Sequence, residues 1–253
     1  MTYRTLIATA LASAGLVTGC GDDDTGGRAD EACDAFVAID EASINDDIGG
    51  AIAAIERFVA TAPDDVAGQV EPVVPLLEAD PEAGSESEEM AVAETASDDW
   101  ARDNCADRTV ELEAFNFAFP DLPAEIEAGR IAFTITNRSQ TGEVHEALLL
   151  RKNDDVTGSA HDVLAAALEG RKVSVENTLA ALEHFAFVGA GIVEPPGADD
   201  YDVIVVDLEP GEYILACLLP VDSPAHIEAY FSGEEVDGEY HLHRGMFAEF
   251  TVR

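Results

Sequence analysis

The sequence has little positive charge. Its 253 residues include 13 Lys and Arg against 52 Asp and Glu, which gives a formal net charge of −39. Nucleic acids and anionic lipid surfaces are bound through basic patches, so we expect no nucleic-acid partner. Cations and positively charged proteins are still compatible with this charge as binding partners. An acidic surface that keeps an exported protein soluble is the simpler explanation of the charge.

Motifs of common enzyme classes are also missing. The sequence contains no GxSxG elbow, no HExxH zinc motif, no phosphate-binding glycine loop and no CxxC pair. Acidic residues are so numerous that any pair of carboxylates is uninformative about acid–base chemistry. We therefore expect that the protein is not an enzyme.

Apolar runs long enough to span a membrane are absent, and the first twenty residues hold only a shorter one. About a dozen apolar residues follow Arg4, fewer than the roughly 20 that a spanning helix needs, and this fits a secretory signal. The run ends in LVTGC at Cys20, which resembles the bacterial lipoprotein box; an ordinary signal peptide is the alternative. The resemblance implies that residues 1–19 are removed and that Cys20 is lipidated. We expect residues 20–30 to be a flexible acidic tether, and the protein to be lipid-anchored at the extracytoplasmic face of the cell membrane, in the cell envelope.

Cysteine is scarce, with four residues in the chain. Export places the protein in an oxidising compartment, where thiols tend to pair. With Cys20 bound to lipid, we expect a disulfide between Cys33 and Cys105, which bracket the N-terminal segment. Cys217 is then an odd thiol that must be buried or bound to a metal.

The first part of the chain is predicted to be helical. Apolar residues recur at helical spacing over 32–44, 51–63, 64–80 and 90–105, and Pro72 and Pro75 should kink or break the third of these helices. The Ser/Glu-rich residues 81–89 are expected to form a loop. We predict a small antiparallel helical bundle over residues 31–105.

From Thr109 the apolar period changes to two, which indicates strands. They are expected at 110–119, 129–137, 144–151, 202–208, 213–219 and 246–252, and two helices at 159–170 and 175–185 should be inserted between strands. The protein is therefore predicted to be α+β, with two domains. Its second domain, residues 106–253, should be a Greek-key β-sandwich of about seven strands.

This second domain carries ordered soft and borderline metal ligands, which are His145, Cys217, His241 and Met246. A set of two His and one Cys with a distant Met favours copper held for electron transfer. His226 and His243 are alternative ligands, because residues 218–240 form a long segment between Cys217 and His241.

Segment 109–253 also resembles the cupredoxins, which have the blue-copper fold. The matching features are Thr136-Asn137 at a strand end, His145 opening the next strand, PGEYILAC ending at Cys217, and the terminal HLHRGMFAEFTV. The resemblance implies a copper site formed by His145, Cys217, His241 and Met246, and electron exchange with a partner protein. The helical segment resembles accessory regions of actinobacterial lipoproteins.

Structural interpretations of the same residues stay open. Cys217 could be an inert core thiol on a strand with Tyr213 and Leu215, and His145 and His241 could be structural or surface histidines. The alternative function is therefore a metal-free cupredoxin-fold protein with a binding or structural role in the envelope. A third possibility is copper storage or delivery through His226 and His243.

Overall fold

The computed structural model describes residues 26–44, 47–140, 142–194 and 201–253. The chain divides into two compact units, Met1–Ala106 and Asp107–Arg253. The predicted signal peptide, the lipidation site Cys20 and the first part of the tether lie outside the described residues. Within the described part, no helix has the length and apolar character needed to cross a membrane.

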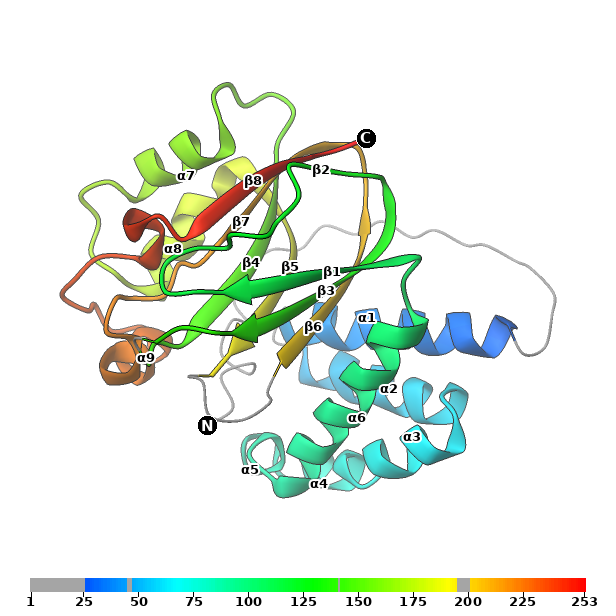
Figure 1. Cartoon of the computed structure of the whole chain (residues 1–253). Helices are drawn as coiled ribbons and strands as arrows, with labels where there is room; N and C mark the ends of the chain where they lie inside the picture. Colours follow the sequence, from blue (N-terminus) through cyan, green and yellow to red (C-terminus); the bar gives the residue numbers. More distant parts are fainter. Residues whose placement is uncertain (1–25, 45–46, 141, 195–200) are drawn as a thin grey trace. The chain divides into compact units, whose positions relative to one another are not determined.

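The first unit is helical, as predicted, and Figure 1 shows its helices in blue to green. They are α1 (Gly26–Ile44), α2 (Ile48–Thr61), α3 (Asp64–Val70), α4 (Val73–Ala79), α5 (Pro81–Ser85) and α6 (Glu88–Asn104). The predicted break occurs at Pro72, which immediately precedes α4, whereas Pro75 fits within the first turn of that helix.

Two predictions for this unit were wrong. The expected loop at 81–89 contains α5 and the start of α6, because Asp80 and Ser87 accept hydrogen bonds from backbone N–H groups of the following turns and cap both helices. The expected tether also ends early, since α1 begins at Gly26. Within α1, Arg28 donates a hydrogen bond to the carbonyl oxygen of Ala60, 3.5 Å away in α2.

The helical unit has an aromatic core and one covalent link. The ring of Phe58 lies 5.3 Å from that of Trp100 and 6.3 Å from that of Phe36. A disulfide joins Cys33 in α1 to Cys105, the residue that follows α6. The bond therefore connects the first and last helices of the unit, at the pair of cysteines that the sequence indicated.

The second unit is a sandwich of two sheets (Figure 1). One sheet has the order β1-β3-β6 and the other β2-β8-β7-β4-β5. The strands are β1 (Arg108–Ala114), β2 (Glu125–Ile126), β3 (Gly129–Asn137), β4 (His145–Lys152), β5 (Phe185–Val193), β6 (Tyr201–Leu208), β7 (Gly211–Ala216) and β8 (Phe247–Val252). Together with the helical unit they form the predicted α+β architecture.

The sheets approach closely at two glycines of β5. A Cβ atom on Gly189 would lie 2.6 Å from the side chain of Ile204, and one on Gly191 would lie 2.7 Å from that of Ile135. A larger residue at either position would therefore force these side chains or the sheets to shift. The same glycines interrupt the apolar alternation, which explains why β5 lies outside the strands predicted from the sequence.

Helices α7 (Ala160–Leu168) and α8 (Val175–Ala181) are inserted between β4 and β5, as predicted. The second helix was predicted to be too long, because Leu182–His184 is a short 3-10 helix, η2, and Phe185 already begins β5. The predicted strand over 213–219 was also too long. It ends at Ala216, so Cys217 follows β7 rather than lying within it.

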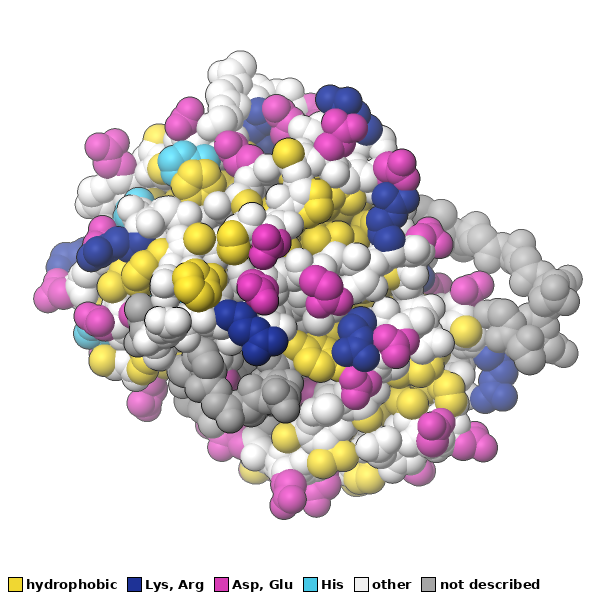
Figure 2. Space-filling view, in the orientation of Figure 1, with side chains coloured by type: hydrophobic (Ala, Val, Ile, Leu, Met, Phe, Trp, Pro, Cys, Tyr) yellow, Lys and Arg dark blue, Asp and Glu magenta, His cyan; other side chains and the backbone are white. Residues whose placement is uncertain are grey.

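Acidic side chains are spread over the face shown in Figure 2, with few Lys or Arg side chains among them. In the sandwich several Lys and Arg side chains pair with carboxylates. Arg130 contacts Asp207 at 2.8 Å, for example, and Arg253 contacts Glu125 at 3.0 Å. The excess of negative charge therefore lies on a solvated surface, where exposed ion pairs contribute little to stability.

Candidate metal centre

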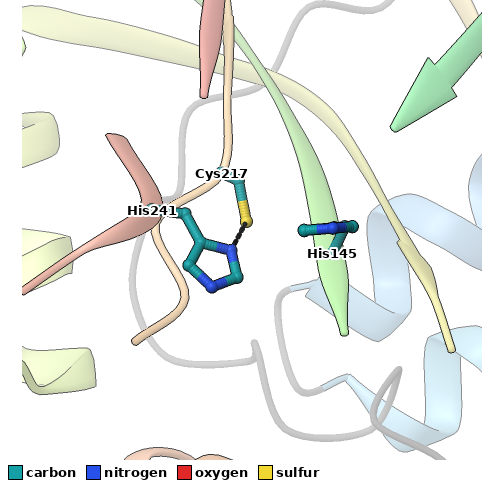
Figure 3. A group of neighbouring side chains, drawn as sticks. All are labelled: His145, Cys217 and His241. Carbon is teal, nitrogen blue, oxygen red and sulfur yellow. Dashed lines mark hydrogen bonds between the residues drawn. The ribbon is translucent and has the colours of Figure 1, made fainter. Parts of the chain in front are cut away.

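Three of the predicted ligands meet at one end of the second sheet (Figure 3). His145 is the first residue of β4, and Cys217 directly follows β7, the antiparallel neighbour of β4. The backbone N–H of Cys217 donates to the carbonyl of Met246 at 3.1 Å, which extends the pairing of β7 with β8 by one residue. The sheet register thus brings the start of β4, the end of β7 and the start of β8 together.

His241 reaches the same place from the segment 218–240, which the sequence left as a long connection. This segment contains helix α9 (Ser223–Phe231), and its two ends pair with each other. The N–H of His241 donates to Leu219 at 2.9 Å, and the N–H of Val221 donates to Glu239 at 2.9 Å. His241 itself begins the 3-10 helix η3 (His241–Arg244). We call residues 218–240 the insertion. Its hydrogen bonds fix the backbone of His241, the third ligand.

The ligand atoms of His145, Cys217 and His241 all lie within 4.8 Å of one another. The Cys217 sulfur is 3.1 Å from Nδ1 of His241, and the two imidazole centroids are 5.1 Å apart. All three side chains are fully buried. The partly buried ring of Phe117 lies edge-on to both imidazoles, with its centroid 5.0 Å from that of His241 and 6.5 Å from that of His145.

Burial sets the protonation of these ligands. It lowers the pKa of His145 to about 3, with a further decrease from neighbouring His241, and it lowers the pKa of His241 to about 4. Both imidazoles are therefore neutral near pH 7 and offer nitrogen lone pairs. Burial also raises the pKa of the Cys217 thiol, and the nearby Glu146 carboxylate adds to this effect. A metal that binds the sulfur must therefore displace a proton.

The imidazole nitrogens have unused hydrogen-bonding capacity. Among the described residues, neither ring nitrogen of His145 has a hydrogen-bond partner, and Nε2 of His241 has none with hydrogen-bond geometry. Buried polar groups are costly when unpaired and are normally satisfied. A metal ion bound by Cys217 and the two imidazoles would satisfy a lone pair on each ring, and one thiolate with two imidazoles is a donor set suited to copper. The residues present therefore fit such an ion.

Backbone and carboxyl groups surround the sulfur. The N–H of Glu146 donates to the Cys217 sulfur at 3.3 Å, and the Glu146 carboxyl accepts from the N–H of Leu218 at 3.3 Å. Burial raises the pKa of Glu146 to about 7. A second carboxylate, that of Glu143, lies 3.4 Å from Nε2 of His241. The sequence did not single out either acid, because any one among 52 acidic residues is inconspicuous.

The other predicted site residues lie as follows. Met246 is fully buried, and its N–H donates to the carbonyl of His241 at 3.2 Å, so its backbone contacts two of the three ligand residues. His226 lies on α9 and His243 is exposed in η3 with its ring against Tyr240. Neither belongs to the buried group, so the structure separates these alternative ligands from His145 and Cys217.

No protein-family model and no curated protein matches the chain. Among solved structures it is similar to auracyanin B, with 20% identity over 58% of this chain and 90% of that one and a TM-score of 0.34. It is also similar to auracyanin A, a "blue" copper protein from the green thermophilic photosynthetic bacterium Chloroflexus aurantiacus, with 16% identity over 57% of this chain and 99% of that one and a TM-score of 0.32. A rusticyanin variant with a Met-to-Gln substitution follows, with 15% identity, 57% and 78% coverage, and a TM-score of 0.30.

With identities and TM-scores this low, the solved structures supply no residue roles for this chain. The two-sheet sandwich and the convergence of His145, Cys217 and His241 agree with the cupredoxin-like fold that the sequence resemblance predicts. The chemistry of the site must be derived from its own side chains.

Proposed function

We propose that the protein binds one copper ion through His145, Cys217 and His241, with Met246 as a more distant ligand, and that it carries electrons rather than catalysing a reaction. The observation that supports this most directly is the buried group of one thiol and two neutral imidazoles within 4.8 Å of one another. When bound, copper supplies a one-electron couple, and this mixed sulfur and nitrogen set suits both of its oxidation states.

The chain's own residues prepare this role in two ways. Full burial of the three ligands, with Phe117 against both imidazoles, excludes water from the site. The N–H of Glu146 directed at the sulfur of Cys217 stabilises negative charge on that atom, and hydrogen bonds to the sulfur are one means of tuning a copper–thiolate potential.

The test is to add Cu(II) to the purified metal-free protein and record its visible spectrum. We expect an intense thiolate-to-copper band with one equivalent of copper. The band should disappear in Cys217→Ser, and it should persist in the control variant His226→Ala, His243→Ala. A colourless protein that binds copper at micromolar or weaker affinity would contradict the proposal.

The alternatives make different predictions about the same residues. A metal-free binding or structural role predicts ligands that do not converge, whereas the three ligand atoms lie within 4.8 Å. Storage or delivery through His226 and His243 predicts a mobile ligand segment, whereas residues 219, 221, 239 and 241 are joined by backbone hydrogen bonds. The geometry therefore favours a fixed, buried site.

We further propose that the protein is held by lipid on Cys20 at the extracytoplasmic face of the cell membrane and exchanges electrons with a partner protein there. The signal-like residues 1–19 and the Cys33–Cys105 disulfide, which suits an oxidising compartment, support this location. The net charge of −39 favours a partner with a basic surface. Replacing Cys20 with Ala should move the protein from the membrane fraction to the supernatant; equal retention of both forms would contradict the anchor.

A further inference from the structure

Glu143 is a buried carboxylate that joins the insertion to the candidate copper site. It lies between β3 and β4 and is only 5% exposed. One oxygen accepts from the N–H of Asp222 at 3.1 Å, and the other accepts from both the N–H and the hydroxyl of Ser223 at 2.7 Å. These contacts place a carboxylate at the N-terminal end of α9, where its charge is favourable.

The same Glu143 oxygen that accepts from Ser223 also faces His241. It lies 3.4 Å from Nε2, while Nδ1 on the other side of the ring lies 3.1 Å from the Cys217 sulfur. A carboxylate oxygen only accepts hydrogen bonds, so the favourable tautomer of His241 carries its proton on Nε2. That tautomer leaves the lone pair of Nδ1 directed at the sulfur side, where a metal would bind.

The Glu143 charge also acts on His145 and favours its protonated form, but the 3.4 Å contact is to His241. Among the described residues, neither of the His145 ring nitrogens has a hydrogen-bond partner. The two imidazoles therefore differ in their outer contacts. A carboxylate that accepts from the outer N–H of a metal-bound imidazole fixes the ring's orientation and makes it a stronger electron donor.

We propose that Glu143 is a positioning residue for His241, and that it lowers the reduction potential of the bound copper by making this one imidazole more electron-rich. This inference rests on the proposed copper function. With a metal bound, the Nε2–H of His241 would donate to Glu143, and Nδ1 and the Cys217 sulfur would be the atoms that hold copper. The stronger donor stabilises Cu(II) more than Cu(I).

The deciding variant is Glu143→Gln, which keeps one acceptor oxygen but removes the negative charge. Loss of such an outer partner typically weakens metal binding about 10- to 100-fold. We expect the Cu(II) affinity to fall in this range and the Cu(I) affinity to fall less. Each tenfold difference between the two losses raises the potential by about 59 mV for one electron.

Ser223→Ala is the matched control, because it removes a hydroxyl that bonds to the same Glu143 carboxylate without changing its charge. A purely structural role for Glu143 predicts similar potentials for both variants. The inference is overturned if Glu143→Gln shifts the potential no more than Ser223→Ala, or if it weakens Cu(I) and Cu(II) binding equally.

A second measurement does not depend on copper. In the metal-free protein, ¹⁵N NMR of the histidine rings should show His241 protonated on Nε2, and this preference should weaken in Glu143→Gln. A proton on Nδ1 of the unmodified protein would overturn the inference. If the unmodified protein takes up no copper, the proposed function fails, and the NMR result still decides whether Glu143 orients His241.

Discussion

The two histidines of the candidate copper site are held by different kinds of structure. His145 lies on β4, which pairs with β5 on one side and β7 on the other. His241 follows the insertion 218–240 and depends on backbone bonds to Leu219 and on the neighbouring Glu143. The comparison shows that a regular sheet can fix a ligand's backbone and leave its ring nitrogens without partners, whereas the irregular segment brings a carboxylate to the ring.

A long insertion beside a metal ligand is less costly than its length suggests. The entropy of closing a loop grows only with the logarithm of its length. Here the ends of the segment are joined by the Pro220–Tyr240 bridge, and its far part is joined to Val173 by a hydrogen bond of 2.8 Å from the N–H of Val236. The insertion thus behaves as a small folded element that positions His241.

The largest expected effects come from replacing each histidine with leucine. His145→Leu and His241→Leu should each lower copper affinity by at least about 100-fold, because a direct ligand matters more than the outer partners whose loss costs about 10- to 100-fold. Copper titration monitored by the visible band measures both. Retention of the full band in either variant would remove that residue from the ligand set.

The same two variants should also differ in their free energy of unfolding when the protein is metal-free. His145→Leu removes two buried nitrogens that lack hydrogen bonds, so it should leave the free energy of unfolding unchanged or increase it. His241→Leu removes the contact with the Cys217 sulfur and should be less stable than His145→Leu by about 1–3 kcal/mol. Urea denaturation at pH 7 measures the difference. Equal stabilities of the two variants would contradict the proposal that His241 has stabilising contacts that His145 lacks.

A pH-dependent effect on stability is expected from Glu146, a buried acid in β4. Its pKa in the folded protein, about 7, exceeds its ordinary value of 4.5, so the folded state holds the proton more tightly than the unfolded state. Its contribution to stability is therefore full below about pH 4.5 and is lost as the pH rises through about 7. The loss should be about 3 kcal/mol at 1.36 kcal/mol per pKa unit.

Glu146→Gln tests this prediction, because the amide can still accept from the N–H of Leu218 but does not titrate. Because the lowered pKa values of His145 and His241 act equally in both proteins, the informative quantity is the free energy of unfolding of the unmodified metal-free protein minus that of the variant. This difference, measured between pH 4.5 and 8, should decline as the pH rises. Parallel pH profiles would show that ionisation of Glu146 does not lower the free energy of unfolding.

The smallest effect is expected in the insertion itself. Asp222 precedes α9 with φ of +59°, a left-handed conformation that glycine adopts at lower cost. Asp222→Gly keeps the N–H that donates to Glu143, so it should change stability by less than about 1 kcal/mol, in the stabilising direction. Thermal unfolding measures the shift. A clear destabilisation would mean that the Asp222 side chain supports the insertion.

Much of the candidate site could be predicted from the sequence, because its ligands are chemically distinctive. Once Cys20 is assigned to lipid and Cys33 is paired with Cys105, the leftover cysteine, followed by His241 and Met246, marks Cys217 without any structure. Glu143 could not be found this way. Its role depends on a contact with Ser223, 80 residues further along the chain, and acidic residues are too common for one to stand out.

Elements of the fold were missed for equally specific reasons. Gly189 and Gly191 weaken the strand pattern of β5, although the close approach of the other sheet is what requires them. The start of α9 did carry a signal, since Pro224 lies in its first turn, where proline is favourable. The surrounding Ser, Gly and Asp residues made the segment resemble a loop.

The Cys33–Cys105 disulfide has a consequence for how the protein resists proteases. The bond closes a loop with a sequence separation of 72 residues, which contains nearly all of the helical unit. A single cut between these two cysteines leaves both pieces covalently joined. In a chain attached to the membrane through Cys20, such a cut would not release the sandwich, so the candidate copper site would stay at the cell surface after the helical unit had been nicked.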